Sequence, residues 1–198
     1  MKAMVPSDEE LVAAFQRGEL GAFDALVLRW DRKIQGAIYR ILGTEEDARD
    51  LCQEAFLKAY RALPGFKGEA RFSSWLYQIA LNLCRDRMRR RKGRTFVSLD
   101  DLGEGDLSTQ PGPSALDVVE ARDVSRTVAA AVATLPEDQR EVIVLKEYQD
   151  LTFLQIAEIL GLPPSTVKTR LYRGLTQLKQ RLEQQGLRGS APVPAPSP

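Results

Sequence analysis

Apolar residues recur along the N-terminal half of the chain with the spacing of amphipathic helices. After Thr44, small and large apolar residues form an unbroken stripe at intervals of three and four: Ala48, Leu51, Cys52, Ala55, Phe56 and Ala59. Such a stripe is typical of a helix that packs one face against a core. No stretch of the sequence alternates convincingly with the period of two expected for a half-buried strand. The pattern therefore predicts an all-α fold.

Capping and glycine signals divide this half of the chain into four expected helices. Ser7 followed by Glu10 predicts a capping box at the first helix, and Gly18 lies past its end. Gly43 and Thr44 separate the second helix from the third. The four helices are expected over residues 8–15, 22–41, 45–63 and 72–94. The apolar stripe of the fourth helix consists of Phe72, Trp75, Leu76, Ile79, Ala80, Leu83 and Cys84.

A change of composition marks the middle of the chain. Over residues 94–121, glycine and proline stand among acidic residues with no sustained apolar period, which predicts a flexible linker. Helical patterns then resume and continue to about residue 184. We therefore expect two small helical domains, residues 8–93 and 122–184, joined by an acidic linker. The tail, residues 185–198, is rich in proline and alanine and is expected to be disordered.

The charge distribution follows the same division. The whole chain has a formal net charge of +1, but residues 94–124 contain 2 basic and 7 acidic residues, a net −5. Residues 1–93 carry 17 basic and 13 acidic residues, a net +4, and residues 125–198 carry a net +2. Two basic blocks on either side of an acidic connector suggest that both ends bind a polyanion.

The sharpest local signal is a helix-turn-helix pattern over residues 151–175. Thr152 starts a short helix whose inward positions are Leu154 (or Phe153), Ile156, Ala157 and Leu160. Gly161 supplies the left-handed residue that a tight turn between helices requires. Pro164 opens a second helix, on which Val167, Leu171 and Leu175 face the first. In this motif the second helix enters the major groove of DNA.

The outward face of that second helix carries polar and cationic side chains: Ser165, Thr166, Lys168, Thr169, Arg170 and Arg173. Hydroxyls at a helix N-terminus suit contacts to phosphate, and long cationic side chains suit guanine edges and phosphates. A helical hairpin with a merely solvated basic face is the simpler alternative. The glycine turn, the small Ala157 and the positive charge favour DNA binding.

The composition argues against catalysis and metal binding. The sequence contains no histidine, which is the commonest general base and metal ligand. The two cysteines, Cys52 and Cys84, are far apart, lie on apolar stripes and fit buried residues in a reducing cytosol. Neither a Gly-Lys-Ser/Thr phosphate loop nor a GxGxxG turn is present. We therefore expect a cytoplasmic protein that is not an enzyme and that needs no cofactor and no metal.

Aromatic residues stand beside a run of arginines in the fourth helix. Phe66, Phe72, Trp75 and Tyr77 precede the arginines at positions 85, 87, 89, 90 and 91. Rings that stack on unpaired bases and cations that hold the backbone are what single-stranded nucleic acid requires. Trp75 and Phe72 lie on the apolar stripe, which favours a place in the core. Tyr77, Asn82 and Arg85 lie off the stripe and are the better candidates for DNA contacts.

Three segments in this order resemble the extracytoplasmic-function sigma factors of bacterial RNA polymerase. Residues 47–61 resemble the polymerase-binding helix of that family, and residues 72–91 resemble its promoter-melting helix. Residues 135–143, together with the helix-turn-helix, resemble its domain four. The resemblance covers residues 8–183. It implies a sigma factor that binds core polymerase, recognises promoter DNA and assists its melting to start transcription of a specific regulon.

The resemblance also implies roles for particular residues. The exposed side of the third helix would dock on the polymerase clamp through Asp50, Gln53, Glu54 and Leu57. Domain two, residues 8–93, would hold the non-template strand of the minus-ten element, with a flipped base near the loop of residues 65–72. Its contact residues would be Phe66, Phe72, Tyr77, Asn82, Arg85 and Arg89. Domain four would read the duplex minus-thirty-five element through Ser165, Thr166, Lys168, Thr169, Arg170 and Arg173. The linker would thread the polymerase.

Expected partners are core RNA polymerase, promoter DNA in duplex and single-stranded form, and an anti-sigma factor that could hold the protein at the inner membrane face. Two other functions remain open on the residues alone. An autonomous regulator would bind duplex DNA through the helix-turn-helix without polymerase. A helical adaptor would bind neither. The helix that combines aromatic residues with arginines argues against both alternatives.

Overall fold

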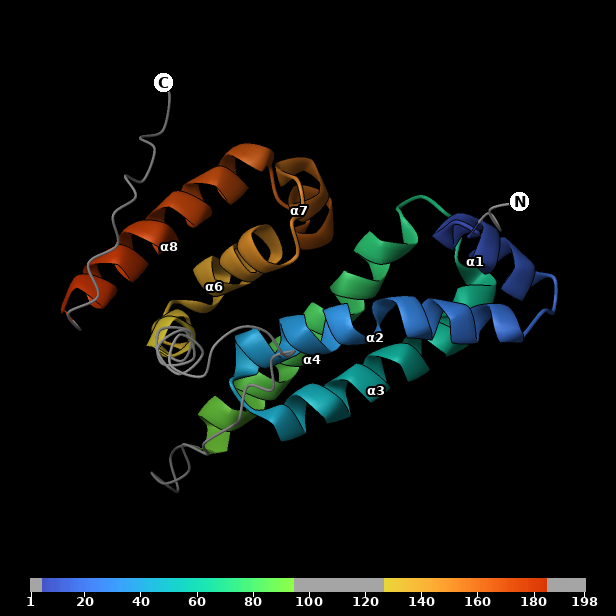
Figure 1. Cartoon of the computed structure of the whole chain (residues 1–198), viewed down its shortest axis with the longest axis horizontal. Helices are drawn as coiled ribbons and strands as arrows, with labels where there is room; N and C mark the ends of the chain where they lie inside the picture. Colours follow the sequence, from blue (N-terminus) through green and yellow to red (C-terminus); the bar gives the residue numbers. More distant parts are fainter. Residues whose placement is uncertain (1–4, 95–126, 185–198) are drawn as a thin grey trace, which may run out of the picture.

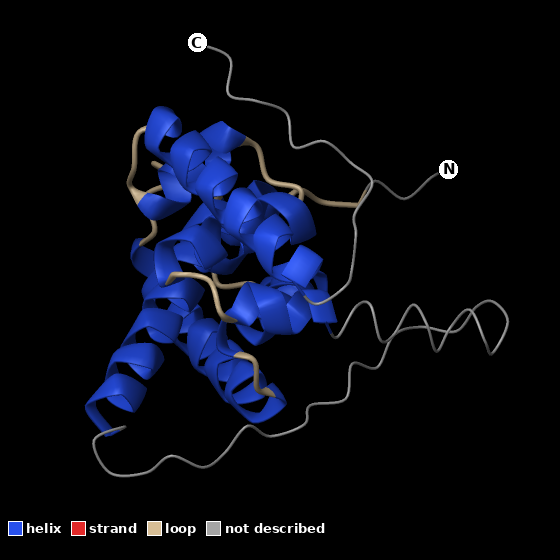
Figure 2. Ribbon diagram, turned by 90° about the vertical axis from the view of Figure 1, so that its left-hand side faces the viewer, coloured by secondary structure: helices blue, strands red, loops and turns tan. Residues whose placement is uncertain are grey.

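The structure is a computed structural model that describes residues 5–94 and 127–184. Within these ranges every regular element is helical, as Figure 2 shows, so the predicted all-α class is confirmed. The predicted linker beyond residue 94 and the predicted tail lie outside the described residues.

The N-terminal unit contains the four helices expected from the sequence. They are α1 (Asp8–Gln16), α2 (Gly21–Leu42), α3 (Glu45–Ala62) and α4 (Phe72–Arg94), with a short 3₁₀ turn η1 (Leu63–Gly65) after α3. In Figure 1, α2 and α3 lie side by side and α4 crosses them, and α3 packs against both α2 and α4.

The helix boundaries agree with the local signals. The Ser7 hydroxyl accepts from the Glu10 amide and the Glu10 carboxylate accepts from the Ser7 amide, so the capping box is confirmed. Gly43 ends α2 with a positive φ of 81°. Thr44 precedes α3 as predicted, but its hydroxyl makes no capping bond and instead donates to Asp47 Oδ2 at 2.8 Å.

The core of this unit is the predicted stripe of α3 together with residues of α2 and α4. All six stripe positions of α3 are buried. Aromatic rings fill the end near α1, where Phe15 and Phe23 lie 5.6 Å apart and Tyr60 packs edge-on against both. Edge-on aromatic packing adds to the stabilisation from burial. These rings join α1 to α2 and α3.

Buried residues lie around most of the circumference of α4, which corrects the sequence analysis. Tyr77, which the stripe placed on the open side, is only 1% exposed. Its ring packs edge-on against Trp30 of α2 at a centroid distance of 6.0 Å, and its hydroxyl donates to Gln149 Oε1 at 2.8 Å. A second element therefore covers the side of α4 that periodicity predicted to be open.

That second element belongs to the C-terminal unit. This unit contains a helical segment over residues 127–133, α6 (Glu137–Ile143), a π-helical turn η2 (Val144–Tyr148), α7 (Phe153–Leu160) and α8 (Pro164–Gln184). The single helix expected after Pro136 is confirmed, although its last turn widens into η2. The two units pack against each other, chiefly through α7 on α4 and η2 on α2 (Figure 1).

Candidate nucleic-acid interface

The helix-turn-helix has the local geometry that its sequence predicts. The Thr152 amide donates to Gln155 Oε1 at 2.8 Å and the Gln155 amide donates to Thr152 Oγ1 at 3.3 Å, which forms a capping box at α7. Gly161 has a φ of 64° and ends α7. A side chain here would be strained because L residues rarely adopt this conformation. The turn therefore fixes how α8 leaves α7.

The packing of α7 against α8 shows which of Phe153 and Leu154 faces inward. Val167 and Leu171 of α8 are buried and Leu175 is half-buried. Leu154 is 72% exposed, so the inward position belongs to Phe153. The ammonium groups of Lys146 and Lys168 lie 5.4 and 5.6 Å from the centre of the Phe153 ring, within cation–π range.

The outer face of α8 presents most of the predicted DNA-reading residues to solvent. Ser165, Lys168, Thr169 and Arg173 are exposed and Thr166 is half-buried. The Thr169 hydroxyl donates to the Ser165 carbonyl at 2.9 Å, so this hydroxyl remains available to DNA as an acceptor. Arg170 is half-buried, and its Nε lies 3.3 Å from Asp138 Oδ2. Lys168 and Arg173 are thus the cations that this face displays most openly.

Three of the four aromatic residues before the arginines, Phe66, Phe72 and Trp75, form one cluster, whereas Tyr77 packs against Trp30. Phe66 and Trp75 are half-buried with ring centroids 4.8 Å apart, and Trp75 lies 6.0 Å from Phe72. Phe72 is completely buried, as its place on the stripe predicted, so the DNA contact that the resemblance implied for Phe72 is wrong in this arrangement. The loop between η1 and α4 therefore packs against these tilted rings through Phe66, which lies on the loop itself.

The arginine run of α4 is divided between two faces. Arg87 and Arg91 form ion pairs with Asp47 of α3, whose side chain is 6% exposed. Arg89 is exposed and forms an ion pair with Asp86 on its own helix. Asn82 is exposed and its carbonyl accepts from Arg85 Nη1 at 3.2 Å. The structure thus assigns Arg87 and Arg91 to the joint between α3 and α4, whereas Arg85 and Arg89 point elsewhere.

Arg85 makes a two-bond contact with a buried carboxylate of the C-terminal unit. Its Nε and Nη2 donate to the two carboxylate oxygens of Glu141 at 2.8 and 2.7 Å. The Glu141 side chain is 2% exposed and the Arg85 side chain 35% exposed. Burial raises the pKa of Glu141 above its usual range, and the bond from Arg85 opposes part of that rise. Sequence reasoning did not single out Glu141, because nothing local marks a partner 56 positions away.

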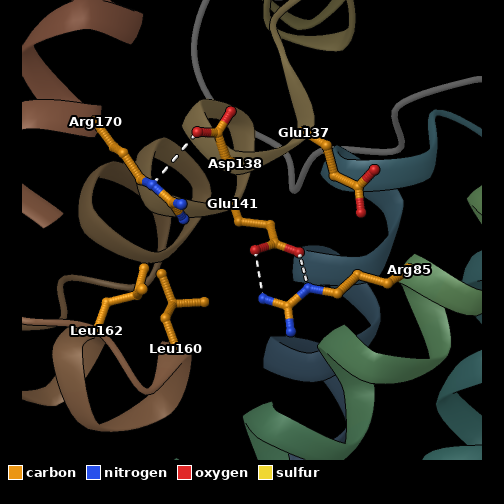
Figure 3. A pocket seen from close by; sticks show the side chains of 7 residues that line it. All are labelled: Arg85, Glu137, Asp138, Glu141, Leu160, Leu162 and Arg170. Atoms are coloured by element: carbon orange, nitrogen blue, oxygen red, sulfur yellow. Dashed lines mark hydrogen bonds and ion pairs between the residues drawn. The ribbon is translucent and has the colours of Figure 1, made fainter. Parts of the chain in front are cut away.

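A cavity of about 440 Å³ lies where these groups meet (Figure 3). Arg85 enters it from α4, Arg170 from α8, and the carboxylates come from α6. Leu160 and Leu162 form its apolar side. Its lining residues are Arg85, Glu137, Asp138, Glu141, Leu160, Leu162 and Arg170.

The predicted polymerase-binding residues share one face of α3. Asp50, Gln53, Glu54 and Leu57 are all exposed, and Leu57 exposes 56% of its surface. Glu54 Oε1 lies 3.1 Å from Lys58 Nζ on the same helix. Tyr60, 41% exposed and three residues beyond Leu57, extends the apolar part of this face. Tyr60 was not among the residues predicted for this face, although its helical spacing from Leu57 could have indicated it.

Neither a metal site nor a membrane span is found in the parts of the chain that the structure describes. Residues 5–94 and 127–184 contain no group of three or more potential metal ligands. No described helix combines the length and the apolar character that crossing a bilayer requires.

Comparisons with known proteins agree with this geometry. Residues 26–94 match the family model described as Sigma-70 region 2, and residues 125–178 match the model described as Sigma-70, region 4. The RNA polymerase sigma-H factor of Pseudomonas aeruginosa is 35% identical over 181 residues, 89% of this chain and 94% of that protein. The sigma factor SigW of Bacillus subtilis is 36% identical over 172 residues, 84% of this chain and 92% of that protein.

Solved structures point the same way. The structure of CnrH in complex with the cytosolic domain of CnrY is similar with a TM-score of 0.67 and 26% identity, over 90% of this chain and 99% of that chain. The two matched regions, their order and the full-length relatives all identify one family. The chain belongs to the extracytoplasmic-function sigma factors of bacterial RNA polymerase.

Proposed function

We propose that this sigma factor binds polymerase and the two promoter elements through three separate surfaces. The exposed face of α3 binds core polymerase, the outer part of α4 and the loop before it bind the minus-ten element, and α8 binds the minus-thirty-five element. Residues 8–93 and 122–184 act as the two domains, and residues 94–121 connect them inside the polymerase.

The exposed face of α8 is the main observation that supports this proposal. Lys168 and Arg173 stand on the second helix of a helix-turn-helix whose turn is fixed by Gly161. Ser165 and Thr166 lie in the first turn, where backbone amides and the helix dipole favour a phosphate. In such a motif the N-terminal half of the second helix contacts base edges in the major groove. Arg170 joins this face if the contact to Asp138 yields to DNA.

The minus-ten element is bound by the edge of domain two. The loop of residues 65–72 carries Phe66, whose half-buried ring leaves part of a face for an unpaired base. Asn82, Arg85 and Arg89 continue along α4 and grip the strand beside it. Buried Phe72 supports the loop from behind, and Tyr77 reaches DNA only when domain four moves away. Stacking of flipped bases offsets the few kcal/mol that unpairing them costs.

Polymerase is bound through the outer face of α3. Asp50, Gln53 and Glu54 offer acceptors and a negative charge, and Leu57 offers an apolar contact. Two weak DNA contacts held on one polymerase gain from effective concentration, which explains why both domains are needed. The polymerase performs the chemistry, and this chain acts by binding alone, without catalysis.

The partners follow from this division. We expect core RNA polymerase and promoter DNA, both as duplex and as a single strand, and the cytoplasm as the place where they meet. An anti-sigma factor that holds the chain, from the membrane face or from solution, is a further expected partner. The similarity to CnrH, solved with the cytosolic domain of CnrY, supports this expectation.

Run-off transcription tests the proposal. Core polymerase is incubated with a pool of genomic promoter fragments, with and without the full chain. We expect discrete start sites that require the chain and that disappear with Lys168→Ala combined with Arg173→Ala. Tight duplex binding without polymerase and without new transcripts would instead favour an autonomous regulator.

A further inference from the structure

Four residues on one face of α4 contact the C-terminal unit. The Ser74 hydroxyl donates to Glu158 Oε2 at 3.1 Å, and Gln78 Nε2 donates to the Glu158 carbonyl at 3.0 Å. Tyr77 bonds Gln149, and Arg85 bonds Glu141. These positions recur at helical intervals along α4. The face that they form adjoins Asn82 and includes Arg85, and so it overlaps the surface proposed for the minus-ten element.

The contact between Arg85 and Glu141 has the form of a phosphate contact. A guanidinium presents a planar fork of donors that binds two oxygens of a carboxylate or a phosphate in the same way. Both oxygens of Glu141 are taken by Arg85. While this pair exists, these two donors of Arg85 cannot hold DNA.

Two further contacts fix domain four against the end of α2. Arg140 Nη1 donates to the Ile41 carbonyl at 2.6 Å, in the last turn of a helix that leaves its carbonyls without partners. The Arg40 guanidinium lies 4.4 Å from the centre of the Tyr148 ring. The packing of the two units thus involves side chains from α2, α4, α6, η2 and α7.

We propose that domain four docks on the minus-ten surface when the sigma factor is not bound to polymerase, and that Glu141 occupies the place of a DNA phosphate on Arg85. This inference rests on the function proposed above for α4. The closed arrangement hides Tyr77 and engages Arg85, so the chain cannot hold a promoter strand until the domains separate.

The closed arrangement is reversible because its central pair is costly to bury. The carboxylate of Glu141 loses its water, which raises its pKa, and one guanidinium offsets that cost. The other interdomain hydrogen bonds use two hydroxyl donors, one amide donor and one guanidinium donor, and all of these groups can bond to water instead. Polymerase, which holds the two domains apart on separate promoter elements, would therefore open the chain.

The helix α6 supplies carboxylates to arginines of both DNA-binding surfaces. Glu141 holds Arg85 of domain two, and Asp138 lies 3.3 Å from Arg170 of domain four. Figure 3 shows both pairs among the side chains that line the cavity, together with Glu137. Only the pair with Arg85 joins the two domains, so only this pair is broken when the domains separate.

A charge-swap series in the full chain tests the docking. Dyes on cysteines introduced at two exposed positions, Arg32 of α2 and Gln180 of α8, report the distance between the domains by energy transfer. Glu141→Arg places two cations together and is expected to lower the transfer, as is Arg85→Glu. The double variant restores an ion pair and is expected to restore the transfer. Glu183→Arg, the same change of charge on an exposed turn of α8, is the control.

A second measurement separates docking from DNA binding. The probe is a labelled single strand that carries the minus-ten sequence identified by run-off transcription. Relief of a competing state raises apparent affinity by the inverse of the open fraction, so Glu141→Arg is expected to bind about three- to ten-fold tighter than the parent and the control. The double variant, although closed again, lacks Arg85 and is expected to bind worst.

Each outcome decides one point. Unchanged energy transfer in Glu141→Arg, or no recovery in the double variant, would overturn the docking. Lower transfer with unchanged probe affinity would overturn the competition with DNA. Arg85→Ala added to Glu141→Arg checks the role of Arg85 itself. If that variant keeps full affinity, the DNA role proposed for Arg85 fails and the competition fails with it, whereas the docking stands.

Discussion

Gly174 of α8 lies directly against Ile143 of α6: a Cβ atom at position 174 would stand 2.7 Å from Ile143 Cδ1 and 3.2 Å from Gln139 Cβ. Both distances are shorter than ordinary carbon contacts. The two helices therefore approach each other so closely at Gly174 that a side chain there must displace its neighbours. This approach holds α6, with its carboxylates, against the recognition helix.

Gly174→Ala is expected to destabilise domain four. Alanine favours a helix over glycine by up to about 1 kcal/mol, but overpacking of a core costs about 1–3 kcal/mol, so the net loss is about 1 kcal/mol. Urea denaturation measures it. Ile143→Val in the same chain removes the clashing methyl and should make the two changes less costly together than the sum of each alone.

Gly36→Ala is the matched control in α2. A Cβ there meets only the tip of the Arg40 side chain, at 3.0 Å, and that tip can move. This variant should be neutral or slightly stabilising. A loss of stability for Gly36→Ala equal to that for Gly174→Ala would contradict the packing argument.

Asp47→Asn is expected to loosen the joint between α3 and α4. The buried carboxylate holds Arg87 and Arg91, which are 33% and 47% exposed. Loss of a buried partner is costly, but the exposure of both arginines reduces the effect to about 1–2 kcal/mol in the free energy of unfolding. Thermal or urea denaturation measures the change.

Asp50→Asn on the same helix is expected to affect polymerase binding rather than stability. Its side chain is exposed on the proposed polymerase face. We expect a change in stability below about 0.5 kcal/mol and weaker binding to core polymerase, measured by competition with another sigma factor. Equal stability losses for the two variants would show that Asp47 does not hold the joint.

The sequence predicted most of what depends on neighbouring residues. The capping box at Ser7, the helix start at Thr152 and the turns at Gly43 and Gly161 lie where their signals indicated. These features are determined within four or five positions of the chain, so a single sequence contains them. The buried stripe of α3 was predicted for the same reason, since one helix face needs only one spacing.

Features set by distant residues could not be predicted in this way. Tyr77 was placed on the open side of α4 because periodicity identifies one buried face, whereas α4 is covered on two sides. The arginine run gave no sign that Arg87 pairs with α3 and Arg85 with α6. In each case the deciding partner lies 40 or more positions away, and no local pattern names it.

Both cysteines are expected to resist alkylation in the folded chain. Burial raises the pKa of the Cys52 and Cys84 thiols from 9.0 to about 12, so the reactive thiolate is scarce at pH 8. Iodoacetamide should modify neither residue in buffer and both in urea, as mass spectrometry would show. Because the folded pKa exceeds the unfolded one, these thiols lower stability as the pH rises from about 9 to about 12. Rapid labelling of the folded chain at pH 8 would contradict the burial.

Lys168→Ala is expected to weaken promoter binding by removing a phosphate contact. Each phosphate contact contributes about 1 to the slope of log affinity against log salt, so this variant should bind three- to ten-fold more weakly at low salt, with a slope smaller by roughly 1. Arg173→Ala should weaken binding as well, and base preference within the minus-thirty-five element should relax if Arg173 reaches a base edge. Holoenzyme binding to labelled promoter duplex over a range of salt concentrations measures both effects.

Lys179→Ala is the control, because this exposed lysine lies three helical turns further along α8, about 16 Å from Lys168. If Lys179→Ala reduced affinity and slope as much as Lys168→Ala, the N-terminal half of α8 would not be the reading surface.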